Sequence, residues 1–176
     1  MRLAFILIVF LLVLTSSFAH PQDPVDSLKS LLKKPQSDTN RVKILNQLSF
    51  RISGNQSDLG IQYAQEALNI SLRINYLSGI SKSYNSLGIC MRVKGDYVNS
   101  LDFFFKALQI DETVGNDKET SRTLSGIGAV YVKLKNYDKG IEFFEKSLEL
   151  RKKNKDLLGV AVCYTNLGDI YEKKGN

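Results

Sequence analysis

Three stretches decide the fold: Tyr84-Asn85-Ser86-Leu87-Gly88, Leu124-Ser125-Gly126-Ile127-Gly128 and Tyr164-Thr165-Asn166-Leu167-Gly168. They are copies of one short motif, and their last glycines lie at positions 88, 128 and 168, so the pattern restarts at a constant interval. A fixed period of this length is typical of stacked supersecondary units, none of which buries its apolar face alone. The sequence therefore predicts a tandem series of similar units.

Within a unit, the apolar residues recur at the spacing of helix faces. Tyr84, Leu87 and Met91 share one face with Gly88, and Phe104 lies on the matching face of the next predicted helix. Glycine inside a helix costs up to about 1 kcal/mol relative to alanine, so its return in each successive unit needs a reason in packing. We expect the two helices of each unit to cross closely at this glycine.

Cap and turn signals place the predicted helices along the chain. Asp23 and Pro24 favour a short helix over 24–34, which would cap the open end of the stack; the alternative is a mobile linker. Asp38 or Thr39 would cap the first helix of the repeats, and Ser57 or Asp58 the second. The predicted ranges are 40–53 with a partner from 57 or 58, 81–94 with 97–114, 121–135 with 137–153, and an unpaired helix from about 159.

The recurring pattern resembles the tetratricopeptide repeat family, most closely over residues 164–171. It consists of an aromatic residue or leucine, then Leu/Ile-Gly, then Tyr, and later Phe. The resemblance covers residues 39–176, about three and a half repeats. It implies an all-α fold, a right-handed superhelix of antiparallel helix hairpins. Two features depart from the family pattern. The period is 40 rather than about 34 residues, and Ser49 replaces the glycine in the first unit.

Residues 1–19 are predicted to be a signal peptide. Arg2 precedes an apolar run of 12 residues, and Ser17 and Ala19 are the small residues expected before cleavage. The alternative is a retained membrane anchor, but such a run is shorter than the roughly 20 residues that span a bilayer. Residues 20–38 would then form the capping helix or linker. The expected localisation is export to the periplasm or the extracytoplasmic face of a membrane.

The composition offers little for catalysis or cofactor binding. One histidine, His20, and no paired Cys-x-x-Cys spacing leave no zinc site, and no phosphate-binding glycine loop occurs. Cys90 and Cys163 lie two repeats apart, beyond the roughly 7 Å reach of a disulfide, and are expected to be buried thiols. We expect these residues to form a non-enzyme that binds no cofactor and no metal; an exported enzyme is the weaker alternative.

The face of the first helices opposite the hairpin core is the candidate peptide-binding groove, as the family resemblance implies. Arg92 and Arg122 on this face predict that the bound segment carries at least one carboxylate. A solvated face without a ligand is the alternative. The candidate groove residues are Lys82, Asn85, Ile89, Arg92, Arg122, Ser125, Ala129, Val132, Thr165 and Asp169.

The predicted partner is therefore a protein or peptide. The formal charge is +6, but the 24 basic residues are interspersed with 18 acidic ones, so no nucleic-acid partner is expected. A membrane contact would require a segment beyond residue 176. The favoured function is an exported interaction module at the front of a membrane signalling protein such as a sensor histidine kinase, by analogy of architecture. The alternative is a self-contained periplasmic scaffold or assembly protein.

Overall fold

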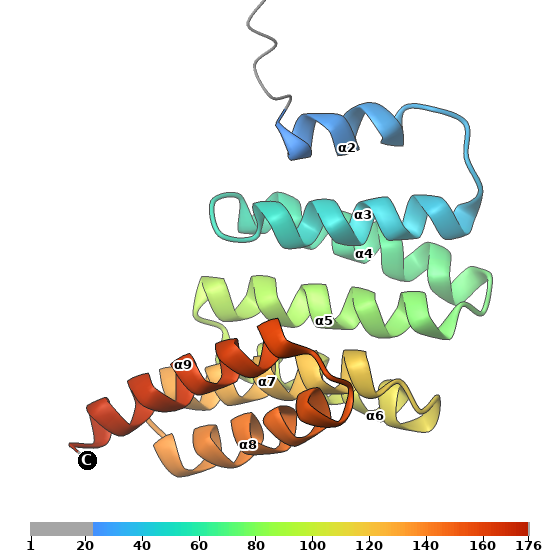
Figure 1. The fold of residues 1–176 in the computed structure, drawn as a ribbon. Coiled ribbons are helices and arrows are strands. Elements are labelled where there is room, and N and C mark those ends of the chain that lie inside the picture. Colours follow the sequence, from blue (N-terminus) through green and yellow to red (C-terminus); the bar gives the residue numbers. More distant parts are fainter. Residues whose placement is uncertain (1–22, 176) are drawn as a thin grey trace, which may run out of the picture.

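The computed structural model describes residues 23–175, and these form eight helices and no strand. The helices stack in chain order as antiparallel hairpins of an all-α right-handed superhelix, which confirms the predicted fold class (Figure 1). Helix α2 precedes the hairpins α3/α4, α5/α6 and α7/α8, and α9 follows them. Their bounds are α2 Pro24–Leu32, α3 Asp38–Ile52, α4 Ser57–Arg73, α5 Leu77–Lys94, α6 Tyr97–Thr113, α7 Asp117–Lys133, α8 Tyr137–Lys153 and α9 Leu157–Lys174.

Several helices begin earlier than the apolar pattern predicts. Helices α5 and α7 begin before the predicted positions 81 and 121, at Leu77 and Asp117. The first turn of α7 is polar, and its cap is the Asn116 side chain, which accepts a hydrogen bond from the Glu119 backbone N–H. Likewise Ser37, rather than Asp38 or Thr39, caps α3. An apolar stripe reports only the turns that face the core, so it misses such polar first turns.

The repeated glycine lies where the two helices of a hairpin cross, as predicted. A β-carbon on Gly88 would lie 2.9 Å from the Phe104 ring, and one on Gly128 would lie 3.0 Å from Phe144. The Ser100 hydroxyl also donates a hydrogen bond of 2.7 Å to the Gly88 carbonyl. The equivalent position in α9 differs, because nothing lies within 4 Å of a β-carbon on Gly168. The glycine therefore provides the space for a phenylalanine of the following helix.

The core runs through the stack as a series of small apolar clusters. Cys90 and Cys163 are buried free thiols, as expected. In the last helix, α9, Tyr171 is 40% exposed. Leu167 is only 7% exposed, because it packs into a cluster with Phe144 and Leu148 of α8. Helix α8, together with Ala129 and Val132 of α7 beside the same cluster, is therefore enough to bury this face of α9.

Polar side chains join consecutive first helices along the inner face. The Asn46 amide of α3 donates to the Ser83 hydroxyl of α5 at 3.1 Å, and the Asn85 amide of α5 donates to the Thr123 hydroxyl of α7 at 2.9 Å. These contacts hold α3, α5 and α7 side by side. Within residues 23–175 no helix is both long and apolar enough to cross a lipid bilayer.

Candidate functional site

The inner face of helices α3, α5 and α7 contains a hollow of about 500 Å³, which we call the inner hollow. Phe50 stands in it with 62% of its surface exposed, although phenylalanine is one of the residues most often buried. Apolar and polar groups thus alternate along the hollow. Its lining residues are Lys43, Asn46, Gln47, Phe50, Lys82, Asn85, Ser86, Ile89, Glu119, Arg122 and Arg151.

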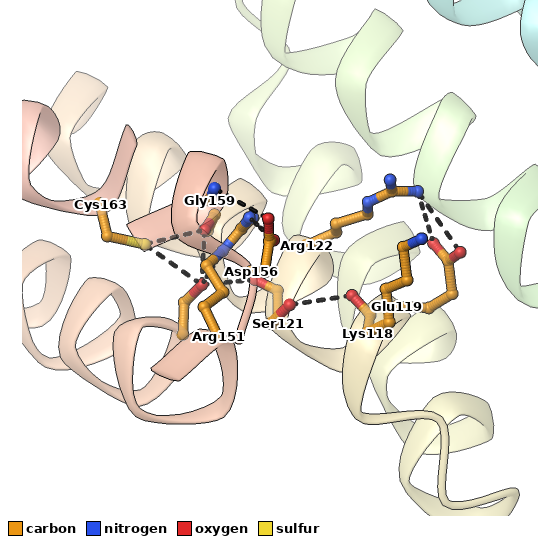
Figure 2. Close-up of polar contacts among 10 residues, drawn as sticks. Lys118, Glu119, Ser121, Arg122, Arg151, Asp156, Gly159 and Cys163 are labelled. Atoms are coloured by element: carbon orange, nitrogen blue, oxygen red, sulfur yellow. Dashed lines mark hydrogen bonds and ion pairs between the residues drawn. The ribbon is translucent and has the colours of Figure 1, made fainter. Parts of the chain in front are cut away.

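Most of the cations in the inner hollow are paired within the chain. Glu119 lies 3.4 Å from the Arg122 guanidinium (Figure 2). It also lies 3.4 Å from the Lys82 ammonium, and its side chain is only 15% exposed. Arg151 is paired with Asp156 at 2.9 Å. Of the four basic residues in the hollow, only Lys43 has no ion pair in the described part of the chain. Three of the four cations in the hollow thus have a carboxylate partner, although the hollow keeps a net positive charge.

Arg151 fixes the turn between α8 and α9 from a buried position. Its guanidinium donates to the Asp156 carboxylate at 2.9 Å and to the Ser147 hydroxyl at 3.1 Å, and Asp156 caps α9 by accepting from the Gly159 N–H (Figure 2). The hydrogen bond from Gly159, together with Arg151, lowers the pKa of Asp156. Arg151 is thus bound within the protein and lines the hollow without a free charge.

The equivalent positions in the two preceding units carry different chemistry. Asp111, one repeat before Arg151, is 1% exposed and accepts hydrogen bonds from the Ser81 hydroxyl at 2.5 Å and the Thr123 hydroxyl at 3.2 Å. Burial raises the pKa of Asp111, because desolvation disfavours its charged form. Ser71, one further repeat earlier, donates to the Ala67 carbonyl. The three equivalent positions therefore differ in both charge and hydrogen-bond partner.

A second hollow of about 340 Å³ lies between α7 and α9, and we call it the α7–α9 hollow. Arg92 of α5 reaches this hollow, and its buried Nε has no hydrogen-bond partner among the described residues. Burial lowers the pKa of the Arg92 guanidinium through desolvation. The lining residues are Arg92, Ala129, Val132, Lys133, Lys135, Tyr137, Phe144, Asn166, Asp169, Ile170 and Lys173.

The predicted groove residues therefore do not form one site. The inner hollow contains Lys82, Asn85, Ile89 and Arg122, whereas the α7–α9 hollow contains Arg92, Ala129, Val132 and Asp169. Ser125 and Thr165 line neither hollow, because the Ser125 hydroxyl is hydrogen-bonded to Ser147 at 2.7 Å and the Thr165 hydroxyl donates to the Ala161 carbonyl of its own helix. Arg92 and Arg122 line different hollows, so a bound carboxylate would meet one of them and not both, and the predicted carboxylate-bearing segment stays a prediction.

The contribution of the first unit to the inner hollow was not predicted from the sequence. Lys43, Asn46 and Phe50 of α3 line the inner hollow, and they are the counterparts of the predicted groove residues Lys82, Asn85 and Ile89. The missed signal was the spacing in sequence between these two sets, which is one position shorter than the period of the later repeats. Glu119 and Arg151 were missed because their roles depend on ion pairs between elements. No group of three or more potential metal ligands occurs within residues 23–175.

Comparisons with known proteins agree with the fold. The family model described as "Tetratricopeptide repeat" matches residues 119–176. The photosystem I assembly protein Ycf3 of Prochlorococcus marinus is 31% identical over 88 residues, which are 50% of this chain and 46% of that protein. A chloroplastic tetratricopeptide repeat domain-containing protein of Arabidopsis thaliana, PYG7, is 32% identical over 50% of this chain and 27% of its own length. The chain thus spans under half the length of each relative.

The fold also resembles a solved structure of low sequence identity. Aspartyl phosphate phosphatase F from Bacillus subtilis superposes with a TM-score of 0.74 at 18% identity, over 84% of this chain and 39% of that chain. The likeness concerns the arrangement of helices alone.

The predicted localisation is wrong. The relatives are named for photosystem I assembly and for the chloroplast, not for the periplasm, and this overturns the expectation of an exported periplasmic chain. The predicted signal peptide, residues 1–19, lies outside the described residues.

Proposed function

Because this chain is a tetratricopeptide repeat protein, we propose that it is a non-enzymatic scaffold that holds an extended segment of one protein partner across the inner hollow. The observation that carries the proposal is the exposed Phe50 in a hollow of about 500 Å³, lined by three parallel first helices. An apolar anchor surrounded by polar side chains is the arrangement that concentrates binding energy at protein interfaces.

The ion pairs of the inner hollow bear on the kind of segment it would hold. Lys82 and Arg122 already share Glu119, so a segment bound there would gain little from a carboxylate beside them. Gln47 and Lys43 are exposed and present polar groups to a bound backbone, while Phe50 and Ile89 present apolar surface. The expected segment is therefore largely uncharged and carries an apolar side chain that packs against Phe50.

An assembly role is the specific form of this scaffold function that the relatives support. Ycf3 is named as an assembly protein of photosystem I, and its similarity covers half of this chain. A scaffold that holds one subunit by an extended segment would keep that segment from other contacts while a complex is built. The alternative, a repeat region joined to a signalling output domain such as a histidine kinase, stays a prediction that no described residue tests.

Site-specific photo-cross-linking in the native host tests the scaffold proposal. A photoreactive phenylalanine analogue replaces Phe50 in one variant and Val98 in another; Val98 is exposed on α6, away from both hollows. We expect position 50 to cross-link to one defined protein, whose yield falls when Ile89 is also changed to Ser. Position 98 should give no such product. Equal products at both positions, or none at position 50, would contradict the proposal.

A further inference from the structure

The α7–α9 hollow carries an excess of positive charge that the protein itself does not neutralise. Arg92, Lys133, Lys135 and Lys173 line it against one acidic residue, Asp169. None of these four cations takes part in an ion pair within residues 23–175. In the inner hollow, by contrast, three of four cations are paired. Both hollows are lined by four cations and one carboxylate, but the cations of the α7–α9 hollow are available to an outside anion, whereas most of those in the inner hollow are already paired.

Arg92 is the strongest anion-binding group in this hollow. Its Nε is buried and lacks a hydrogen-bond partner among the described residues, and an unpaired buried donor costs free energy until an acceptor reaches it. A carboxylate is a fitting acceptor, because its two oxygens match the two parallel N–H groups of a guanidinium. A carboxylate bound there would satisfy this donor and offset the charge of the surrounding lysines.

The shape and lining of the hollow favour a peptide over a nucleic acid. Ala129, Val132 and Ile170 give the hollow an apolar component that suits a small aliphatic side chain. Asp169 would repel the regular array of phosphates in a nucleic acid, but it can accept a hydrogen bond from a peptide N–H. Tyr137 is the one aromatic residue of the lining apart from the fully buried Phe144, so bases have no stacking platform.

Lys135 occupies the rim of the hollow in a strained backbone conformation. Its φ is +59°, in the left-handed region, whereas the equivalent turns of the neighbouring units have Gly95 and Gly175 at φ values of +82° and +81°. A non-glycine residue there costs about 1 kcal/mol or more in strain, and such strain often accompanies a binding function. The chain thus has a lysine at the turn of the hairpin that borders the α7–α9 hollow, where glycine would fit with less strain.

We propose that the α7–α9 hollow is a second binding site, which takes an acidic segment of a protein partner with a glutamate or aspartate carboxylate against Arg92 and a small apolar side chain against Val132. Lys133, Lys135 and Lys173 attract the segment, and Asp169 binds one of its backbone N–H groups. This inference rests on the proposed function because it assigns the bound carboxylate to a protein partner. It concerns a different hollow, so each site is tested on its own.

A fluorescence anisotropy titration of the full chain tests this site with three labelled probes. The first is a peptide of three Glu-Val-Glu-Ser repeats, the second is the same peptide with Gln in place of Glu, and the third is a 12-nucleotide oligothymidine. We expect the Glu peptide to bind at least about tenfold more tightly than its Gln twin, as charge-assisted hydrogen bonds predict. Its affinity should also fall as salt is raised.

Matched variants locate the binding to Arg92 and its neighbours. Arg92→Gln should weaken Glu-peptide binding by about tenfold, whereas Arg122→Gln, in the inner hollow, should change it less than about twofold. Lys135→Gly should weaken binding while raising the urea midpoint, because it removes both a charge and backbone strain. Lys155→Gly is the control: Lys155 has a φ of +55° but does not line the hollow, so only the midpoint should rise.

Three results would overturn the site. The Glu and Gln peptides could bind equally, or Arg92→Gln could leave the affinity unchanged while circular dichroism shows an intact fold. Tighter binding of the oligothymidine, lost in Arg92→Gln, would assign the hollow to nucleic acid instead. None of these results affects the cross-link at Phe50, so failure of this site and failure of the scaffold proposal are separate observations.

Discussion

The free space around its α-carbon determines whether a repeated glycine can be replaced by alanine. At Gly88 a β-carbon would lie 2.9 Å from the buried Phe104 ring, whereas at Gly168 it would meet nothing within 4 Å. Gly88→Ala should therefore lower the free energy of unfolding by about 1–3 kcal/mol through overpacking. Gly168→Ala should raise it by up to about 1 kcal/mol through helix propensity alone. Urea denaturation followed by circular dichroism measures both, and effects of the same sign would contradict this account.

The buried carboxyl of Asp111 predicts a specific pH dependence. Its pKa in the folded protein is raised by burial above the ordinary value of about 3.9, so the unfolded chain loses this proton first as the pH rises. The contribution of Asp111 to stability is then fully present below about pH 3.9 and is lost as the pH rises through its folded pKa. The unfolding free energy of the wild type, relative to that of Asp111→Asn, should therefore fall as the pH rises above about 4.

Urea titrations of the two proteins at stepwise pH values measure this difference. Asparagine is the matched change, since it fills the same space and can bond to the Ser81 and Thr123 hydroxyls without titrating. Other groups titrate equally in both proteins, so their effects cancel in the difference. A difference that is flat, or that rises with pH, would show that Asp111 does not have the raised pKa described here.

At the scale of elements, helix α9 has fewer helix neighbours among the described residues than α5. It packs mainly against α8, with a contact to α7 between Cys163 and Ser125, whereas α5 is flanked by α4, α6, α3 and α7. Tyr164 and Tyr171 of α9 are exposed. We expect the backbone amides of α9 in this chain to exchange with deuterium faster than those of α5 and α7, because its opening exposes less apolar surface. Hydrogen exchange by mass spectrometry measures this, and equal protection would contradict it.

The helices could be predicted from the sequence because their signals are local. Glycine spacing, the apolar stripe and the cap residues each act within a few turns, and α8 matches its predicted range 137–153. The start of α7 was missed because its first turn is polar and does not show in the stripe. The ion pairs of Glu119 and Arg151 join side chains across turns and between helices, and sequence spacing alone does not encode those contacts.

At the scale of the whole molecule, a stack of repeats should lose stability by increments when a terminal helix is removed. Deleting residues 157–176 removes α9 and leaves α2 to α8 with their own interfaces. We expect the shortened chain to remain helical, with a lower urea midpoint, because Phe144 and Leu148 lose their contacts with Leu167. Circular dichroism and urea denaturation test this expectation.

The control for the deletion is a double variant at the start of α9. Leu157 and Leu158 are exposed, so changing both to Ser should leave the midpoint nearly unchanged. If the deletion instead abolishes the helical signal at neutral pH and room temperature, the stack folds as one cooperative unit. Its stability would then not be the sum of contributions from the interfaces between neighbouring helices.

The candidate site was predicted in part, and the reason lies in the geometry of the stack. Helical spacing identified the face that carries Lys82, Asn85 and Ile89, and this face does line the inner hollow. The spacing did not show that Arg92 and Arg122 belong to separate hollows. That separation depends on how each unit is rotated on the one before it, which follows from side-chain packing rather than from the repeat length.

Ser71, Asp111 and Arg151 occupy equivalent places in three successive repeats, yet one is neutral, one acidic and one basic. Genes with tandem repeats are prone to unequal recombination, which duplicates or exchanges units. A recombinant here would set the Asp111 carboxylate or the Arg151 guanidinium in surroundings built for another group, and an unpaired buried charge costs about 3–5 kcal/mol. Changes in the number or order of the repeats would thus destabilise the protein, and natural selection would act against them.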